Sequence, residues 1–355
     1  MKRGSEVFLL AAGLFTVLAT GVLLNSCSSG GNSTPLSSIA LYVTDDLAGY
    51  KQVITTINKI DLKHTGSGAS CNVFTGPLTL DIANLTGVMQ LIDTASCPAV
   101  PYNRIHLEFG RNVALMDQAD TSSCLFTSFL DQGNQPNTLT CGTSTCTLDI
   151  NGAVNLLVTQ QNKLALDFDL KSFKVANFGN PQTCSVTMKV SPLHAGEIEA
   201  RKNPEAFTGL VSSLSSSDQT FTLTRGSTSF TVLYSGISTS LQPGLDTLLQ
   251  RAQDDGLRVR VVASAIDLAN SAITASSLYA KLEGTIAAGG LDAANHLFTV
   301  IYKSGKSMVV DYGSAIVEGT LAEGAWVEIK LTGFDGIHFH AGKIEVLPSG
   351  TTTED

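Results

Sequence analysis

A long strand pattern reads Val53-Ile54-Thr55-Thr56-Ile57-Asn58-Lys59-Ile60-Asp61-Leu62, with apolar and polar residues interchanging as they do along a half-buried β-strand. Further stretches of this kind, separated by turn residues, lie at 39–44, 104–109, 163–170 and 184–190. Charged residues make up only 15% of the chain, and small and β-branched residues are abundant, which favours β structure over helical bundles. Repeated short strands therefore predict an antiparallel β-sandwich over residues 37–200. One short amphipathic segment, residues 85–93, fits a helix.

The N-terminus has the order of an export signal. A basic start, Met1-Lys2-Arg3, precedes an apolar run at residues 7–24, and Leu24-Asn25-Ser26 leads into Cys27. Leu24-Asn25-Ser26-Cys27 resembles the lipobox of bacterial lipoproteins. The resemblance implies a signal peptide over residues 1–26, lipid modification of Cys27 and, because Ser28 follows rather than Asp, transfer to the outer membrane. The alternatives are an ordinary secretory signal or an uncleaved membrane anchor, with an incidental cysteine.

The rest of the chain is expected to be soluble apart from this anchor. No second apolar stretch is long enough to cross a membrane, and residues 27–36 read as a flexible polar tether. The net charge is −9, and no block of basic residues occurs. Nucleic-acid binding requires clustered Lys and Arg to neutralise phosphates, so nucleic acid is not an expected partner.

The remaining cysteines all lie within the predicted sandwich. They are Cys71, Cys97, Cys124, Cys141, Cys146 and Cys184. An even number in an exported protein predicts disulfides, and the wide spacing without nearby histidines argues against a zinc site. Proximity along the chain favours the pairs 71–97, 124–141 and 146–184.

The predicted sandwich resembles the DUF4382 family. Thr44-Asp45-Asp46, Gly49-Tyr50 and the long strand are similar to the start of that family, and residues 164–169 and 188–192 to its end. The chain departs from the family pattern by a cysteine-rich insertion between about residues 117 and 145. The resemblance implies a fold class and export, and it implies no chemistry.

The C-terminal half contains an internal repeat. Residues 221–226, 230–234, 255–261 and 273–278 correspond to residues 298–303, 308–312, 323–329 and 339–344, and each unit starts with a glycine, Gly209 or Gly284. The pattern resembles the DUF5666 domain, which implies two small OB-like β-barrel modules at 205–282 and 283–347. A linker at 200–204 precedes them, a disordered tail at 348–355 follows, and an insertion at 241–253 is predicted to be a helix.

OB-like barrels often bind oligonucleotides or sugars through aromatic platforms in a basic groove. The aromatic residues of the repeat fall at alternating strand positions and are interpreted as core. Arg225, Arg258 and Arg260 are interpreted as balanced by Asp254 and Asp255.

Two sets of side chains are candidate metal ligands. Asp45, Asp46, Asp167 and Asp169 would bind calcium if strand ends bring them together. His338 and His340 would share one face of a strand and, with Asp335 or Glu345, hold a metal ion. The simpler interpretations are turn-forming aspartates and two exposed histidines. No nucleophile elbow, zinc-protease motif, phosphate-binding loop or haem-attachment motif occurs, so no catalytic residue and no cofactor is assigned.

The sequence thus predicts an all-β protein, an antiparallel β-sandwich followed by two small OB-like β-barrel modules. We expect a non-catalytic protein, attached to the membrane through its N-terminal lipid anchor, with a binding or scaffolding role at the outer membrane or cell surface. Its partner would be an envelope protein or a glycan. The alternative is a carbohydrate-binding or calcium-dependent adhesive module.

Overall fold

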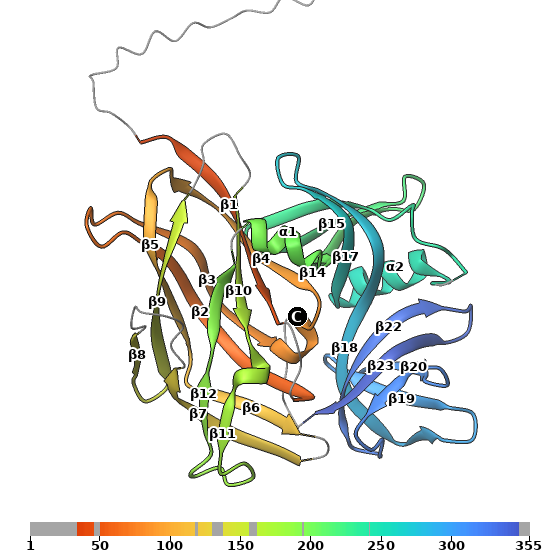
Figure 1. Cartoon of the computed structure of the whole chain (residues 1–355). Coiled ribbons are helices and arrows are strands. Elements are labelled where there is room, and N and C mark those ends of the chain that lie inside the picture. The colour runs from red at the N-terminus through yellow and green to blue at the C-terminus, as the bar shows by residue number, and fades with distance from the viewer. Residues whose placement is uncertain are drawn as a thin grey trace, which may run out of the picture. The chain divides into compact units, whose positions relative to one another are not determined.

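The structure is a computed structural model that describes residues 34–45, 50–117, 120–129, 138–155, 162–193, 195–240 and 242–347. The described residues form one compact unit. Strands account for most of it, with two α-helices and two short 3-10 turns in these ranges (Figure 1). The predicted all-β class is confirmed.

Two sheets build the N-terminal half. The first has the order β13-β10-β1-β4, and the second has the order β11-β12-β7-β6-β2-β5-β9-β8, with β3 also paired to β2. Most neighbours are antiparallel, but β1 runs parallel to β10 and β7 runs parallel to β12. The strands are β1 (Leu36–Thr44), β2 (Gln52–Lys63), β3 (Ser70–Asp81), β4 (Met89–Pro98), β5 (Pro101–Gly110), β6 (Asn112–Asp117), β7 (Asp120–Phe129), β8 (Thr138–Cys141), β9 (Thr145–Asn155), β10 (Asn162–Phe168), β11 (Lys174–Ala176), β12 (Ser185–Met188) and β13 (Val190–Leu193).

The sheet that contains β1 is covered on both faces. Ile39, Leu41 and Val43 belong to the hydrophobic core between the two sheets. Ala40 and Tyr42, which point the other way, belong to a second core shared with the C-terminal half. Side chains alternate across a strand, so burial on both faces explains why residues 39–43 of this strand are all apolar.

The same double burial explains why the helix expected at residues 85–93 is wrong. A 3-10 turn, η1 (Ile82–Leu85), is followed by β4. Met89 and Leu91 contact the second core, and Ile92 contacts the core of the sandwich. A strand with both faces buried loses its polar alternation and becomes indistinguishable, by pattern alone, from a buried helix.

The disulfides correct two of the three expected pairs. Cys71–Cys97 is confirmed, whereas the other bonds are Cys124–Cys184 and Cys141–Cys146. Cys184 directly precedes β12, whose first residue lies opposite Leu125 of β7, so the strand register brings Cys124 next to it. Cys141 and Cys146 lie opposite each other in the β8–β9 ladder. Register between strands, rather than closeness along the chain, decides the pairing.

Both repeat units have the same strand pairing. In the first unit the pairs β14–β15, β15–β16, β16–β18, β18–β17 and β17–β14 close a five-stranded cycle, with β16 parallel to β18. In the second, β18–β19, β19–β20, β20–β23, β23–β22 and β22–β18 close a cycle of the same kind. The strands are β14 (Glu205–Ser215), β15 (Thr220–Arg225), β16 (Thr228–Leu233), β17 (Arg258–Asp267), β18 (Ala272–Asp292), β19 (Leu297–Tyr302), β20 (Lys306–Asp311), β21 (Ile316–Glu318), β22 (Trp326–Phe334) and β23 (Phe339–Leu347).

The two barrels share one strand. β18 is 21 residues long, and its first half closes the first barrel while its second half opens the second (Figure 1). The repeated glycines lie at equivalent places in the first strand of each barrel. A Cβ on Gly209 would lie 2.7 Å from the carbonyl oxygen of Thr224, and a Cβ on Gly284 would overlap the carbonyl oxygen of Ile301. Only glycine permits this approach of neighbouring strands.

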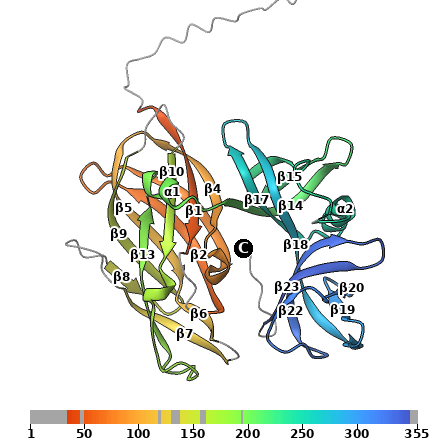
Figure 2. The ribbon, with the colours of Figure 1, turned by 45° about the vertical axis from the view of Figure 1, so that its right-hand side comes forward.

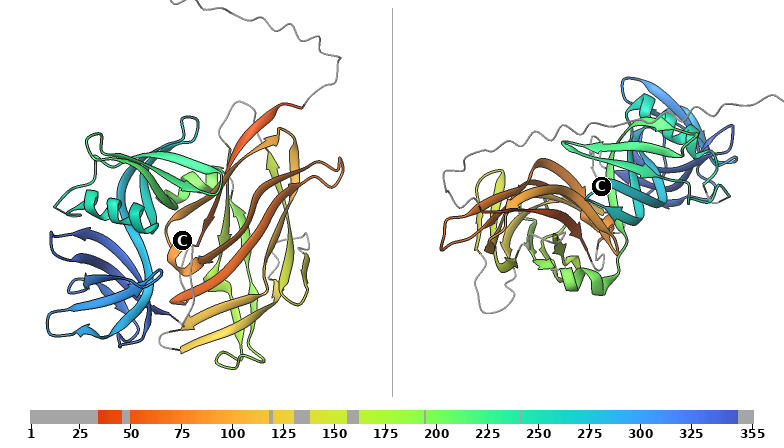
Figure 3. Two further views of the ribbon diagram at one scale, coloured as in Figure 1. Left: turned by 180° about the vertical axis from the view of Figure 1, so that it is seen from behind. Right: turned by 90° about the horizontal axis from the view of Figure 1, so that it is seen from above.

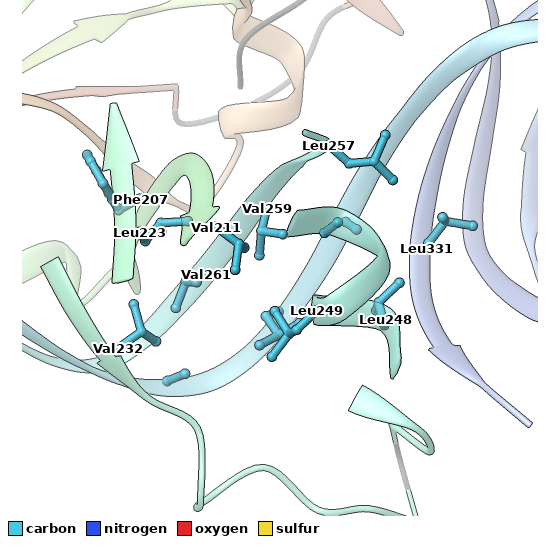
Figure 4. Packing of buried hydrophobic residues seen from close by; sticks show 14 of the residues in the cluster. Phe207, Val211, Leu223, Val232, Leu248, Leu249, Leu257, Val259, Val261 and Leu331 are labelled. Carbon is cyan, nitrogen blue, oxygen red and sulfur yellow. The ribbon is translucent and has the colours of Figure 1, made fainter. Parts of the chain in front are cut away.

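The helix expected at 241–253 is present as α2 (Leu245–Asp255). It ends at Gly256, whose left-handed φ of 61° suits a helix C-terminus. Leu248 and Leu249 are buried and lie among side chains of the first barrel, with Leu331 of β22 close to Leu248 (Figure 4). The helix therefore contributes to the hydrophobic core that includes residues of both barrels. The view from behind shows the helix next to strands of both barrels (Figure 3).

The expected linker at 200–204 is short and partly helical. α1 (Ala195–Arg201) covers its first residues, and β14 begins at Glu205. β14 then pairs in parallel with β4, from Glu205 opposite Met89 to Phe207 opposite Leu91, before it enters the barrel (Figure 2). The Tyr42 hydroxyl donates to Glu205 Oε2 at 2.6 Å beside this junction. The first sheet of the sandwich thus continues into the first barrel.

Candidate functional site

The aspartates expected to bind calcium have protein partners. Asp45 Oδ1 accepts the backbone N–H of Leu170 at 3.1 Å, and its Oδ2 accepts the Thr86 hydroxyl at 3.1 Å. Asp167 Oδ2 forms an ion pair with Arg201 at 2.9 Å. Asp46 lies outside the described residues, as does Cys27.

Asp169 caps the 3-10 turn η2 (Leu170–Ser172). Its carboxylate accepts the backbone N–H and the hydroxyl of Ser172, and the Lys189 ammonium at 2.6 Å. Burial alone would raise the pKa of Asp169, but the hydrogen bonds from Lys189 and Ser172 outweigh it, so the pKa lies below its ordinary value. In the parts of the chain that the structure describes, no three His, Cys, Asp or Glu side chains are grouped to hold a metal ion. Calcium binding stays a prediction.

The two histidines do not share a strand face. His340 lies in β23, whereas His338 lies in the bend before it, where its backbone N–H donates to Asp335 Oδ1 at 2.7 Å. The His340 imidazole lies 3.4 Å from a carboxylate oxygen of Asp311 and 3.4 Å from one of Asp335. The tight turn takes His338 out of the strand, and this separates the pair.

The two acidic residues expected to balance the arginines of the first barrel have other partners. Asp254 Oδ1 accepts a hydrogen bond from Gln250 Nε2 at 2.8 Å. Asp255 accepts the Tyr302 hydroxyl, Arg251 and Lys306, each at 2.5 Å. These contacts join α2 to the β19–β20 hairpin. Burial alone would raise the pKa of the Asp255 carboxyl, but its contacts with Lys306, Tyr302 and Arg251 hold that pKa below its usual range. Arg225 and Arg258 lie elsewhere, in the wall of a cavity.

This cavity has a volume of about 400 Å³, which lies within the size range of small-molecule sites. It lies where β3 and β4 of the sandwich face β14, β15 and β17 of the first barrel. Its lining residues are Phe74, Thr75, Gly76, Pro77, Leu78, Ile92, Asp93, Gly209, Leu210, Thr224, Arg225, Gly226, Ser227 and Arg258.

The cavity opens where β4 and β14 diverge. Their pairing ends at Leu91 and Phe207, and Arg225 from β15 fills the point of separation. Its Nη2 donates to the carbonyl oxygen of Leu91 at 2.7 Å and to that of Ile92. The guanidinium lies 5.2 Å from the centre of the Phe207 ring. Arg225 thus donates hydrogen bonds to carbonyl oxygens of β4 at the point where the pairing with β14 ends. Because these contacts and the Phe207 ring hold the guanidinium in place, this part of the cavity wall is fixed.

Asp93 presents a carboxylate to the cavity. Its Oδ1 accepts the Thr228 hydroxyl at 2.6 Å and the backbone N–H of Thr94 at 2.8 Å. Its Oδ2 accepts no hydrogen bond from the residues that the structure describes. Arg258 lines the same cavity, as does Ser227, which is exposed in the two-residue turn between β15 and β16.

The apolar part of the wall comes from both halves of the chain. Phe74, Leu78 and Ile92 are buried residues of the sandwich, and Leu210 of β14 keeps 48% of its surface exposed. Sequence reasoning missed this site, since its residues are separated by up to 184 positions (74 to 258) and form no motif. The one available signal was an apolar residue, Leu210, directly after the glycine that starts the first repeat unit.

Comparison with known proteins identifies the N-terminal part alone. Residues 37–186 match the family model described as a domain of unknown function, DUF4382. The resemblance inferred for this part of the chain is therefore confirmed. No curated protein and no solved structure matches the chain. Among the described residues, no helix combines the length and the apolar character needed to cross a membrane.

Proposed function

We propose that the protein is a non-catalytic lipoprotein of the bacterial envelope, anchored to the outer membrane through Cys27, which binds a ligand or partner there. The anchor is supported by the sequence Leu24-Asn25-Ser26-Cys27 behind a basic and apolar signal. The disulfides of the sandwich support export, because such bonds persist in oxidising compartments. The C-terminal barrels are proposed to be DUF5666-like modules.

The observation that carries the binding role is the cavity between the sandwich and the first barrel. It combines polar side chains with a smaller apolar wall, and its volume lies in the range of small-molecule sites. Two parts of the chain contribute to it, so a ligand there would contact the DUF4382 domain and a barrel together. The second candidate, a calcium-dependent adhesive module, would use the carboxylates of Asp45, Asp167 and Asp169 near the ends of β1 and β10, each of which has protein partners in the structure.

The anchor is tested by Cys27→Ala in a Gram-negative host, with Ser28→Ala as the matched control. We expect the wild type and Ser28→Ala to incorporate a palmitate analogue and to fractionate with outer membranes. Cys27→Ala should lose the label and leave the membrane fraction without a change in melting temperature, because Cys27 lies outside the disulfide-bonded part. Signal cleavage followed by membrane retention of Cys27→Ala would overturn the lipid anchor. Ser28→Asp should shift the protein to the inner membrane.

A further inference from the structure

We propose that the cavity lined by Asp93, Leu210 and Arg258 binds a neutral, hydroxyl-rich ligand, a mono- or disaccharide. This inference rests on the proposed binding role and names the ligand class. The cavity volume of about 400 Å³ suits a ligand of this size. The cavity offers both an apolar surface and polar groups. These complement the two kinds of surface that a sugar ring presents, an apolar C–H face and a rim of hydroxyls.

The apolar face would pack against Leu210 and the wall of β3. Leu210 is exposed in the middle of a strand whose neighbouring side chains, Phe207 and Val211, are buried in the barrel core. Leu78 of β3 and Ile92 of β4 line the same space. Contact with a sugar ring would remove the exposed surface of Leu210 from water, which stabilises the bound state.

The hydroxyl rim would meet Asp93 and Arg258. An ionised carboxylate oxygen accepts hydrogen bonds only, and Oδ2 of Asp93 receives none from the described residues, so it suits a ligand hydroxyl as donor. A guanidinium donates only, and Arg258 suits the oxygen of a second hydroxyl. Hydroxyl groups satisfy both kinds of partner at once.

The charges of the wall disfavour a cation, because the guanidinium groups of Arg225 and Arg258 outnumber the Asp93 carboxylate and would repel an ammonium ion. A phosphate or carboxylate placed next to Asp93 would be repelled by that carboxylate. Arg225 also directs Nη2 to the carbonyl oxygens of Leu91 and Ile92, which commits those donor hydrogens to the protein. A neutral ligand avoids both repulsions.

The wall is preorganised. Arg225 is held by two carbonyl oxygens and by the ring of Phe207, and the Thr228 hydroxyl fixes the Asp93 carboxylate at 2.6 Å. Because these polar groups are already fixed, less conformational entropy is lost when a ligand binds. The polar part of the wall is therefore already in place before a ligand binds.

The test measures binding of a saccharide panel to the mature chain, extracted from membranes in mild detergent, by saturation-transfer NMR and calorimetry. The panel holds glucose, galactose, mannose, N-acetylglucosamine, cellobiose, maltose and galacturonate. We expect at least one neutral sugar to bind, and we expect Asp93→Asn and Leu210→Ser each to weaken it by about tenfold or more, since a charged hydrogen bond or buried apolar contact is lost. Asp218→Asn, in the exposed turn between β14 and β15, is the matched control and should bind as the wild type does.

Three results would overturn the ligand class. The first is the absence of binding by every sugar at millimolar concentration while the melting temperature shows that the chain stays folded. The second is binding that Asp93→Asn and Leu210→Ser leave unchanged, and the third is binding of galacturonate in preference to galactose. Fractionation of Cys27→Ala decides the anchor separately, so a failed sugar panel with an intact anchor would reject the ligand and retain the envelope location.

Discussion

Gln52 Nε2 donates a hydrogen bond to Glu345 Oε2 at 2.9 Å, across 293 positions of sequence. Gln52 begins β2 of the sandwich, and Glu345 lies in β23 of the second barrel; each is 2% exposed. Lys343 approaches the other oxygen of Glu345 at 2.6 Å, and Lys330 lies 3.6 Å from it. A buried carboxylate thus joins the second barrel to the DUF4382 domain.

The Glu345 carboxylate makes folding stability depend on pH. Burial alone would raise its pKa, but the Lys330 and Lys343 charges and the hydrogen bonds outweigh burial, so the pKa lies below its ordinary value. A carboxyl group whose pKa is lowered in the folded state stabilises the fold fully at pH values above its pKa in the unfolded chain, which is about 4.3 for Glu. This stabilisation is lost as the pH falls through the pKa of the folded state. We expect the free energy of unfolding, measured with urea, to fall below about pH 5 less steeply in Glu345→Gln than in the wild type. Equal slopes would show that another carboxylate dominates.

Removal of the same side chain should destabilise the protein at pH 7. Glu345→Ala leaves Lys330 and Lys343 near each other without their shared carboxylate. Breaking a fully buried ion pair costs about 3–5 kcal/mol, and we expect about 2–3 kcal/mol here because the lysine side chains remain partly exposed. Glu323→Ala, in an exposed turn of the same barrel, is the control and should change the free energy of unfolding by less than about 0.5 kcal/mol. A loss in Glu345→Ala no larger than in Glu323→Ala would contradict this role.

The disulfides should differ in their contribution to stability. Cys124–Cys184 closes a sequence separation of 60 residues, and Cys141–Cys146 closes one of 5. Chain-entropy arguments give about 4 kcal/mol for the longer loop and about 2 kcal/mol for the shorter one. We expect Cys124→Ala/Cys184→Ala to lower the midpoint of urea unfolding more than Cys141→Ala/Cys146→Ala. Peptide mapping under non-reducing conditions checks the pairs directly, and a 124–141 linkage would refute this assignment.

Gly284 should not tolerate a side chain. A Cβ at this position overlaps the Ile301 carbonyl oxygen, where β18 passes β19. We expect Gly284→Ala to destabilise the protein by about 1–3 kcal/mol, as overpacking does. Gly196→Ala in α1 is the control, since its Cβ meets no neighbour within 4 Å and alanine stabilises a helix by about 0.5–1 kcal/mol relative to glycine. Thermal melting of both variants measures the difference, and equal melting temperatures would disprove the close approach.

Strand content and the repeat could be read from the sequence because both depend on local patterns. Alternation in residues 53–62 and the repeated glycines, Gly209 and Gly284, report on side-chain direction and close strand contact within a few residues. The helix α2 could be predicted for the same reason. Residues 85–93 were misjudged since Met89 and Ile92 face two different cores, and only the neighbours on each face reveal that.

The sequence by itself determined the all-β class and the two repeat units, since each follows from residues close together in the chain. The anchor at Cys27 is proposed from a local pattern of the same kind. Only the tertiary structure decided the pairing of Cys124 with Cys184, the parallel pairing of β4 with β14 and the cavity around Asp93 and Arg258. These features depend on strand register and on contacts between distant segments. The register and these contacts are fixed by packing interactions across the whole core, and a short stretch of sequence does not contain that information.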